Sequence, residues 1–190
     1  MFDHLSKKFP HLAERLGQYA ALYEQLEVPA RTILLNEGQI SRKAFHIKKG
    51  CLRLWFNNNG VDTTFQFAFE NQLISSADSF RRNTPSLFSI ETIEPSVLMV
   101  LSKKNYNAMM ADLGDDPVFL NQLVDTLFER QLYYMREFLS FIRDTPKQRY
   151  QNLIKDKPQI LQRVPQRYIA SYLGITPVHL SRIRTQLRIS

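Results

Sequence analysis

The run from residue 163 to residue 188 constrains the fold of this 190-residue chain more than any other segment. Gly174 lies in its middle, and a glycine just after a helix commonly takes the positive φ that other residues adopt only at a cost. Thr176 and Pro177 suit the N-cap and the first position of a second helix. We therefore predict two short helices joined by a tight turn, with these apolar residues at helical spacing: Ile169, Tyr172, Leu173, Leu180, Ile183 and Leu187.

The second predicted helix has a polar outer face opposite its apolar stripe. Two crossed helices with such a face can read the DNA major groove, where the N-terminal residues of the second helix meet the base edges. Arg182 is the strongest candidate, because a guanidinium can bond guanine O6 and N7 together. An ordinary helical hairpin with a solvated basic face is the alternative. The predicted DNA-binding residues are Arg167, Thr176, Pro177, Val178, His179, Ser181, Arg182 and Thr185.

Basic residues are concentrated in the same part of the chain. Residues 145–190 hold nine Lys or Arg and one acidic residue, a net charge of +8, whereas the whole chain carries +7. A basic surface beside a recognition helix is what binding to phosphates requires. Basic tails also keep proteins soluble or bind acidic membranes, but these alternatives do not account for the glycine, the cap and the apolar stripe.

Length and composition limit the class of protein. A hydrophobic content of 44% in 190 residues is enough for packed cores in one or two domains. No apolar run approaches the ~20 residues of a membrane span, and the first residues lack a signal-peptide core, so we expect a cytoplasmic protein without membrane contacts. Cys51 is the single cysteine, which excludes an intrachain disulfide and a four-cysteine metal site; we expect it to be buried.

Two patterns of secondary structure precede the basic segment. From Thr32 to about Leu101, short runs of β-branched and aromatic residues alternate with turn signals, which predicts about eight strands in a small antiparallel roll or barrel. Before it, apolar residues at helical spacing predict a helix within the first 26 residues, through Leu5, Phe9, Leu12, Leu16, Tyr19, Tyr23 and Leu26.

Helix returns at Lys103, and one long helix is predicted from about Asp116 to Arg143. Its apolar residues alternate at spacings of four and three, the pattern of a helix that pairs with another helix. Further apolar residues on other sides indicate a second surface to cover, so we expect dimerisation; a helix wholly buried within one chain is the alternative. Thr145 and Pro146 then begin the next helix. The predicted dimer seam is Leu120, Val124, Leu127, Gln131, Tyr134, Phe138 and Phe141.

This order of elements resembles the Crp/Fnr (cyclic AMP receptor protein and fumarate–nitrate regulator) superfamily of transcription factors over essentially the full length. In the roll the resemblance rests on EGQISRKAFHIKKGCLRLWF, and near the end on the more specific IASYLGITPVHLSRIR. It implies an α+β fold: a cyclic-nucleotide-binding-type antiparallel β-roll (jelly roll) in 1–115, a dimerisation helix in 116–144 and a helix-turn-helix domain in 145–190. The family's base-reading arginine falls at Arg182. Its other base contacts fall at uncharged residues, Pro177 and Val178, which implies a different target sequence.

The effector site departs from the family pattern. The family's phosphate-binding cassette uses a Gly-Glu pair and, about ten residues later, Arg-Ser or Arg-Thr. Both charged anchors are missing from the corresponding positions, and the two arginines nearby would serve another anion or lie in solvent. A phosphodiester without a positive partner is costly to desolvate, so we expect weak or no cyclic AMP binding, no cofactor and an unidentified effector. The candidate pocket residues are Ser75, Ser76, Arg81, Arg82, Ser86 and Leu87.

These patterns predict a homodimeric regulator that places two recognition helices about 34 Å apart on an inverted-repeat site in double-stranded DNA, with RNA polymerase as a further candidate partner. A metal-dependent enzyme on a similar roll would need clustered histidines, and only His46 lies in the predicted roll, so neither an enzyme nor a metal site is expected. A ligand-sensing barrel that acts through protein contacts without DNA is the remaining alternative.

Overall fold

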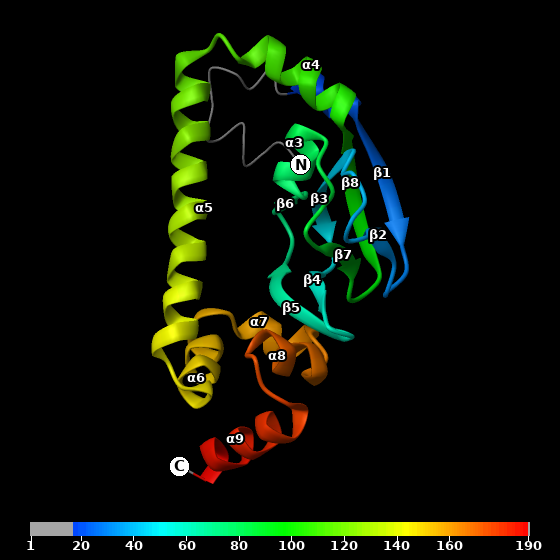
Figure 1. The fold of residues 1–190 in the computed structure, drawn as a ribbon. Helices are drawn as coiled ribbons and strands as arrows, with labels where there is room; N and C mark the ends of the chain where they lie inside the picture. Colours follow the sequence, from blue (N-terminus) through cyan, green and yellow to red (C-terminus); the bar gives the residue numbers. More distant parts are fainter. Residues whose placement is uncertain (1–16, 190) are drawn as a thin grey trace.

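The structure is a computed structural model that describes residues 17–189. Its first part is a roll of eight antiparallel strands in two sheets, ordered β1-β8-β3-β6 and β2-β7-β4-β5 (Figure 1). Most successive strands lie in opposite sheets, as in a jelly roll, which confirms the predicted α+β fold. The strands are β1 (Tyr23–Val28), β2 (Ile33–Leu35), β3 (Lys43–Lys49), β4 (Leu52–Asn58), β5 (Val61–Ala68), β6 (Leu73–Ile74), β7 (Ser89–Thr92) and β8 (Ser96–Ser102).

Apolar side chains from both sheets fill the interior of the roll. Ile47 of β3, Leu52 of β4, Ile90 of β7 and Leu98 of β8 are completely buried there. The tight turn between β3 and β4 requires a glycine, because Gly50 has φ +117° and any side chain at this position would overlap with Ser96. The turn signal at this glycine therefore has a steric basis.

The predicted N-terminal helix is wrong in its last part. The 3₁₀ helix η2 (Tyr19–Leu22) is followed directly by β1, which pairs with β8 from Tyr23 opposite Leu101 to Val28 opposite Ser96. Apolar residues three or four apart suit a helix, but here the backbone groups of β8 take a strand partner, and that pairing overrides the local pattern. The earlier part of the predicted helix, including Leu5, Phe9, Leu12 and Leu16, lies outside the described residues.

Three helices follow or interrupt the roll: α3 (Ala77–Arg82), α4 (Lys103–Leu113) and α5 (Pro117–Arg143). Ser102 and Asp116 cap the last two, since their side chains accept hydrogen bonds from the backbone N–H of Asn105 (3.1 Å) and of Phe119 (2.9 Å). In Figure 1, α4 carries the chain across one end of the roll, and α5 then runs back along its side to the C-terminal helices.

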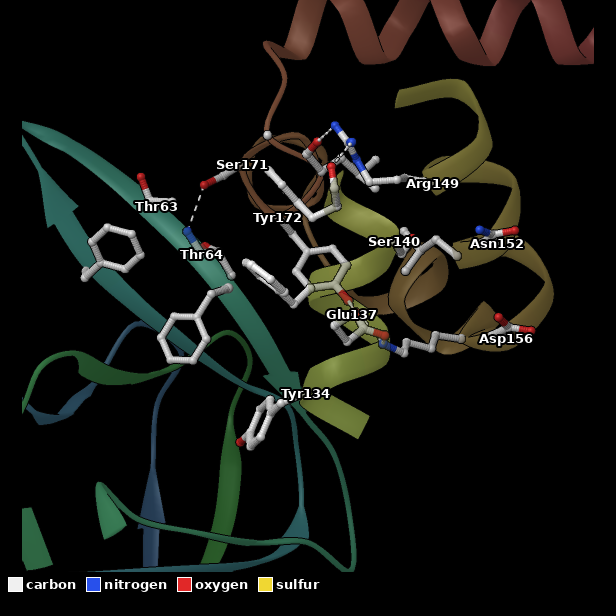
Figure 2. A pocket seen from close by; sticks show the side chains of 18 residues that line it. Thr63, Thr64, Tyr134, Glu137, Ser140, Arg149, Asn152, Asp156, Ser171 and Tyr172 are labelled. Atoms are coloured by element: carbon white, nitrogen blue, oxygen red, sulfur yellow. Dashed lines mark hydrogen bonds and ion pairs between the residues drawn. The ribbon is translucent and has the colours of Figure 1, made fainter. Parts of the chain in front are cut away.

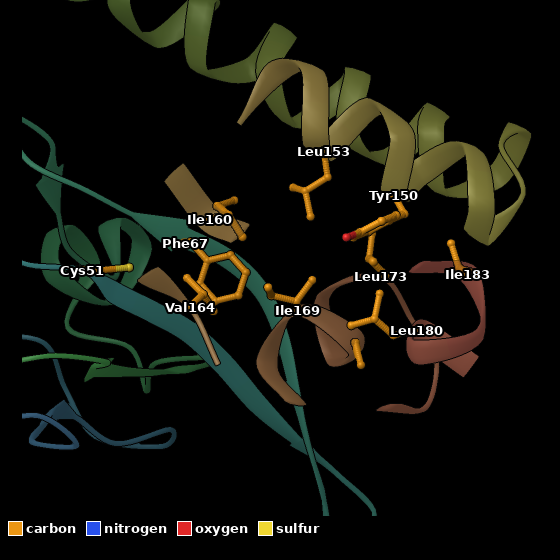
Figure 3. Close-up of a cluster of buried hydrophobic side chains, with 11 residues drawn as sticks. Cys51, Phe67, Tyr150, Leu153, Ile160, Val164, Ile169, Leu173, Leu180 and Ile183 are labelled. Carbon is orange, nitrogen blue, oxygen red and sulfur yellow. The ribbon is translucent and has the colours of Figure 1, made fainter. Parts of the chain in front are cut away.

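The C-terminal part consists of α6 (Pro146–Asp156), α7 (Pro158–Arg163), α8 (Gln166–Tyr172) and α9 (Pro177–Ile189). The predicted start at Thr145 is confirmed: Thr145 and Gln148 form a reciprocal capping box. A single apolar cluster joins this part to the roll. Cys51 of the β3–β4 turn and Phe67 of β5 lie in it beside Ile160 of α7 and Val164, which follows α7 (Figure 3). Cys51 is completely buried, as expected. Across residues 17–189, none of the helices has the length and apolar character needed to cross a membrane.

Candidate nucleic-acid interface

The turn between α8 and α9 has the predicted geometry. Gly174 has φ +67°, and the backbone N–H groups of Gly174 and Ile175 donate to the carbonyls of Ser171 and Ala170, both at 3.0 Å. This pair of hydrogen bonds is the Schellman motif, which satisfies the last carbonyls of a helix. Phe141 of α5 lies against the turn, because a Cβ on Gly174 would stand 2.6 Å from its ring. Glycine is therefore required here both for its φ and for its size.

The start of α9 is capped as predicted. Thr176 Oγ1 accepts a hydrogen bond from the N–H of His179 at 3.2 Å, and Pro177 occupies the first helical position. Leu180 and Ile183 are 1% and 3% exposed and pack against the α8 side of the cluster. These contacts fix which side of α9 faces outward.

The outer face of α9 is polar and exposed. Val178, 62% exposed, stands beside exposed Pro177 and His179, and Ser181, Arg182, Thr185 and Gln186 line a shallow hollow one turn further along. The Thr185 hydroxyl donates to the carbonyl of Ser181 at 3.1 Å and keeps acceptor capacity outward. Six of the predicted DNA-binding residues thus share one face, and Thr176 lies at its start as a cap.

Arg167 is the predicted phosphate contact on α8. It is exposed, and its guanidinium lies 4.6 Å from the centre of the Tyr168 ring and donates to the Tyr168 hydroxyl at 3.0 Å. Stacking of this kind limits the positions that a flexible arginine samples. The side chain is therefore held against Tyr168 on the surface of α8.

Three of the nine basic residues counted in 145–190 bond carboxylates or backbone carbonyls among the described residues. Arg163 makes a bidentate ion pair with Glu70, at 2.7 and 2.8 Å, and bonds Glu94. Lys157 donates to Glu137 at 2.7 Å, and Arg149 donates to three backbone carbonyls, those of Phe141, Asp144 and Leu173. The charge available to phosphates is consequently smaller than the sequence count suggests.

These internal bonds shift the pKa values of Glu70 and Lys157, among other groups. The Arg163 guanidinium lowers the pKa of Glu70 to about 2, with help from the Gly50 N–H that also bonds its carboxylate. Burial lowers the pKa of Lys157, but hydrogen bonds to Glu137 and Tyr133 outweigh burial and raise it above its usual value. These shifts keep Glu70 and Lys157 charged near neutral pH.

No residue of α5, all of which is described, is buried. The predicted seam divides in two. Leu120, Val124 and Leu127 are exposed on the surface of α5. Tyr134, Phe138 and Phe141 instead line a cavity toward the C-terminal helices. Tyr134 also donates to Gln66 Oε1 of β5 at 2.8 Å. Gln131 is exposed. A second row at spacings of four and three is exposed too: Phe128, Leu132, Met135, Leu139 and Ile142.

The candidate effector residues differ in their exposure. Ser76 and Ser86 are buried, and the Ser86 hydroxyl donates to the carbonyl of Phe88 at 2.7 Å. Ser75 is half-buried, whereas Leu87 is 80% exposed. Arg81 is exposed, and Arg82 pairs with Asp78 at 3.2 Å on the surface of α3.

The chain is similar to known proteins in structure, but neither of two sequence comparisons finds a match. No protein-family model matches the chain, and no curated protein matches it. CLP of Xanthomonas campestris, described as a c-di-GMP-responsive global regulator, is 15% identical and superposes with a TM-score of 0.73 over 93% of this chain and 92% of that chain. FixK2 of Bradyrhizobium japonicum is 15% identical, with a TM-score of 0.69 over 88% and 85%. The catabolite activator protein of Thermus thermophilus is 17% identical, with a TM-score of 0.55 over 92% and 83%.

This chain shares the fold of these three proteins, as the resemblance found in its sequence predicted. Within that fold, sequence reasoning missed the contacts between α8 and the roll. Arg53 of β4, 3% exposed, bonds Glu91 at 2.7 Å and lies between the rings of Trp55 and Tyr168, 4.7 and 4.0 Å from their centres. An arginine in the middle of the apolar run CLRLWF was the available signal, because a buried guanidinium needs a partner. The chain thus carries a charged junction between α8 and its roll.

Proposed function

We propose that this chain is a homodimeric, sequence-specific DNA-binding transcription regulator of the Crp/Fnr type, acting in the cytoplasm and without enzymatic activity. The observation that carries the proposal is the exposed face of α9. It stands at the end of a fold shared with two proteins described as a regulator and an activator, and the buried stripe of α9 orients it outward. The polar residues of this face are of the types that contact base edges and phosphates.

Within this proposal, Arg182 reads a guanine, and Val178 contacts a thymine methyl or excludes a partner. Arg167, Ser181 and Thr185 bind phosphates or bases nearby, and His179 lies at the edge of the contact. Thr176 acts indirectly, because its oxygen holds the first turn of α9. Pro177 sets where that turn begins. Pro177 and the exposed Val178 stand at the start of α9, where the family has charged base contacts. This supports a target sequence that differs from the family's.

A second copy of the chain is the proposed partner of α5. A helix of 27 residues without a buried side chain leaves a wide apolar face in water, and exposed patches of this kind mark interaction sites. The exposed residues favour a seam that starts at Leu120, Val124 and Leu127 and continues along the second row, since an apolar stripe drifts around a straight helix. Two α9 helices related by a two-fold axis would then meet an inverted repeat.

Dimerisation can be tested with one charge on each side of α5. Met135→Asp places a charge in the second row and should give a monomer in sedimentation velocity, because a buried unpaired carboxylate is costly. Thr126→Asp, half a helical turn away around the helix, is the matched control and should stay dimeric. Equal dimerisation of both variants would place the interface elsewhere.

The proposal includes weak or absent binding of cyclic AMP and an effector that remains unidentified. Arg82 is paired with Asp78, the Ser86 hydroxyl is bonded to backbone, and the apolar interior of the roll offers no positive partner to a phosphodiester. Calorimetric titration with cyclic AMP, and with cyclic di-GMP because CLP is described as responsive to it, should show no saturable heat. Micromolar binding of either nucleotide would show that other residues hold the phosphate.

DNA binding is tested by selecting bound sites from a random duplex pool and measuring their affinity by fluorescence anisotropy. Arg182→Ala should cost about 1–3 kcal/mol on the selected site and relax the preference at one base pair. Arg167→Ala should weaken binding to all sequences alike, and it should reduce the slope of log affinity against log salt concentration by about 1. Arg82→Ala, on the surface of the roll, is the matched control and should change neither.

Two outcomes would overturn parts of the proposal. If Arg182→Ala leaves the sequence preference intact, another residue reads the bases. If the wild-type chain retains no duplex at low ionic strength, the ligand-sensing barrel that acts through protein contacts is the better account. The internal pairing of Arg163, Lys157 and Arg149 favours that alternative, because it removes charge from the basic surface. Transcription with purified RNA polymerase would then test that partner.

A further inference from the structure

A cavity of about 530 Å³ lies where the roll, α5 and the C-terminal helices meet (Figure 2). Strand β5 forms one wall with Thr63 and Thr64. The C-terminal third of α5, the α6 helix and the end of α8 form the others. Its volume falls within the range of small-molecule sites, about 300–1,000 Å³, and it is bounded by β4, β5, α5, α6 and α8 of one chain. The cavity is separate from the effector residues of the roll, none of which lines it.

Aromatic rings make up much of the cavity wall. They come from both sides of the junction: Phe56, Phe65, Tyr134, Phe138, Phe141 and Tyr172. Rings at opposing walls offer flat apolar surfaces for a planar ligand, and such surfaces favour offset or edge-on stacking. Phe141 also supports the Gly174 turn, so one wall of the cavity is shared with the helix pair.

The charged groups at the cavity are balanced, and three of the four are bonded within the chain. Glu137 accepts hydrogen bonds from Lys157 and from the Tyr172 hydroxyl, and Arg149 donates to backbone carbonyls of Phe141, Asp144 and Leu173. Asp156 adds a second carboxylate at the rim, so the lining carries two cations and two anions. An anionic ligand would have to displace Glu137 or a helix carbonyl to gain a positive partner.

We propose that this cavity binds a small, uncharged, planar aromatic molecule. The aromatic walls supply its contact surface. The hydroxyls of Thr63 and Ser140 donate to the Val61 carbonyl and to Asp144 Oδ2, so they orient the ligand by accepting hydrogen bonds from it. The proposal does not rest on the DNA-binding function, because the cavity is complete within one chain. Its test therefore measures binding without DNA, and its failure would leave the proposed function untouched.

The test uses the full chain and N-phenyl-1-naphthylamine, an uncharged fluorescent aromatic probe. We expect saturable fluorescence enhancement with one site per chain. The anionic anilinonaphthalene sulfonate should bind at least tenfold more weakly. Equal affinity for both probes would contradict an uncharged ligand, and the lack of any saturable signal would exclude the site.

Two variants locate the probe. Thr63→Trp fills the cavity from β5, where an aromatic residue suits the strand, and should weaken binding at least tenfold. Val61→Trp is the matched control on the same strand, 64% exposed and outside the lining, and should bind as the wild type does. Asn152→Trp fills the cavity from α6 and tests the same point if Thr63→Trp fails to fold. Unchanged binding in a folded filling variant would place the probe elsewhere.

A last measurement distinguishes a small molecule in the cavity from insertion of a second copy of the chain. Phe138 is 66% exposed as well as part of the lining, so a partner helix could insert there. The probe should bind wild-type dimer and monomeric Met135→Asp with affinities within threefold. Binding to the monomer alone would show that the partner chain, not a small molecule, occupies the cavity.

Discussion

The contact between α8 and α9 and the contact between these helices and the roll are built from different interactions. Between α8 and α9 the contact is apolar and fully buried, through Ala170, Leu173, Leu180 and Ile183. Toward the roll, a smaller apolar patch is joined by charged and polar groups. There Arg163 pairs with two glutamates, the guanidinium of Arg53 stacks on Tyr168, and Ser171 accepts a hydrogen bond from the N–H of Thr64 at 2.9 Å.

Because of this difference, one set of interactions fixes the geometry of the α8–α9 pair and another fixes its position against the roll. Apolar packing is insensitive to salt and to loss of charge, whereas partly exposed ion pairs weaken when salt is added or a charge is removed. The helix pair should therefore keep its geometry under conditions that loosen its attachment to the roll. Substitutions in the two contacts should give effects of different size and different dependence on solution conditions.

The largest effect is expected inside the helix pair. Leu180→Ala removes a side chain that is 1% exposed and should lower the free energy of unfolding by about 2–5 kcal/mol. Thermal unfolding followed by circular dichroism checks this, with loss of DNA binding in parallel. Val178→Ala, on the exposed face of the same helix, should change stability by less than about 0.5 kcal/mol. Equal effects of the two would mean that α9 is not packed as described.

The next effect concerns the turn. Gly174→Ala combines a positive φ with a Cβ only 2.6 Å from the Phe141 ring, and should cost more than the ~1–2 kcal/mol of the φ alone. Gly60→Ala is the matched control: its φ is +88°, but nothing lies within 4 Å of the added Cβ. Chemical denaturation of both variants isolates the steric part. Equal costs would show that Phe141 yields without strain.

The helix pair could be predicted because its signals are local. Gly174, Thr176 and Pro177 each suit one backbone position, and the structure places them there. The same local reasoning misassigned Tyr23 and Leu26, whose spacing also fits a helix, because their strand partner β8 lies more than 70 residues away in the chain. Local chemistry decides turns and caps, but it cannot decide which segment completes a sheet.

The junction with the roll was beyond sequence reasoning for a related reason. Arg163 was counted as part of a DNA-binding surface, yet its partners Glu70 and Glu94 are 93 and 69 residues away along the chain. A net charge does not reveal which charges are already paired. The aromatic cavity escaped notice likewise, since its lining comes from separate segments of the chain. Only the tertiary fold brings these groups together.

Breaking the ion pairs at the junction should have a smaller effect on stability than either change in the helix pair. Arg163→Gln should cost about 0–1 kcal/mol, because Arg163 and Glu70 are each about one-third exposed, with side-chain exposures of 28% and 32%. Its effect should show instead as faster amide hydrogen exchange in α7 and α8, with exchange in β7 and β8 unchanged. Arg167→Gln, an exposed arginine without an acidic partner among its hydrogen bonds and ion pairs in the described residues, is the control. Uniform acceleration across the chain would indicate global destabilisation instead.

The smallest effect is the pH dependence of the same contact, and its direction follows from Glu70. The pKa of Glu70 falls from 4.5 to about 2 in the folded chain because Arg163 bonds its carboxylate. A depressed pKa stabilises the fold fully above the unfolded value, and this contribution declines as pH falls from about 4.5 toward 2. The stability difference between wild type and Arg163→Gln should therefore be largest at pH 5–7 and shrink below pH 4. Leu180→Ala should show no such convergence, since no ionisable group is removed. Denaturation curves at pH 3, 4 and 6 compare the three chains. A pH-independent gap for Arg163→Gln would mean that packing, rather than charge, holds α7 against the roll.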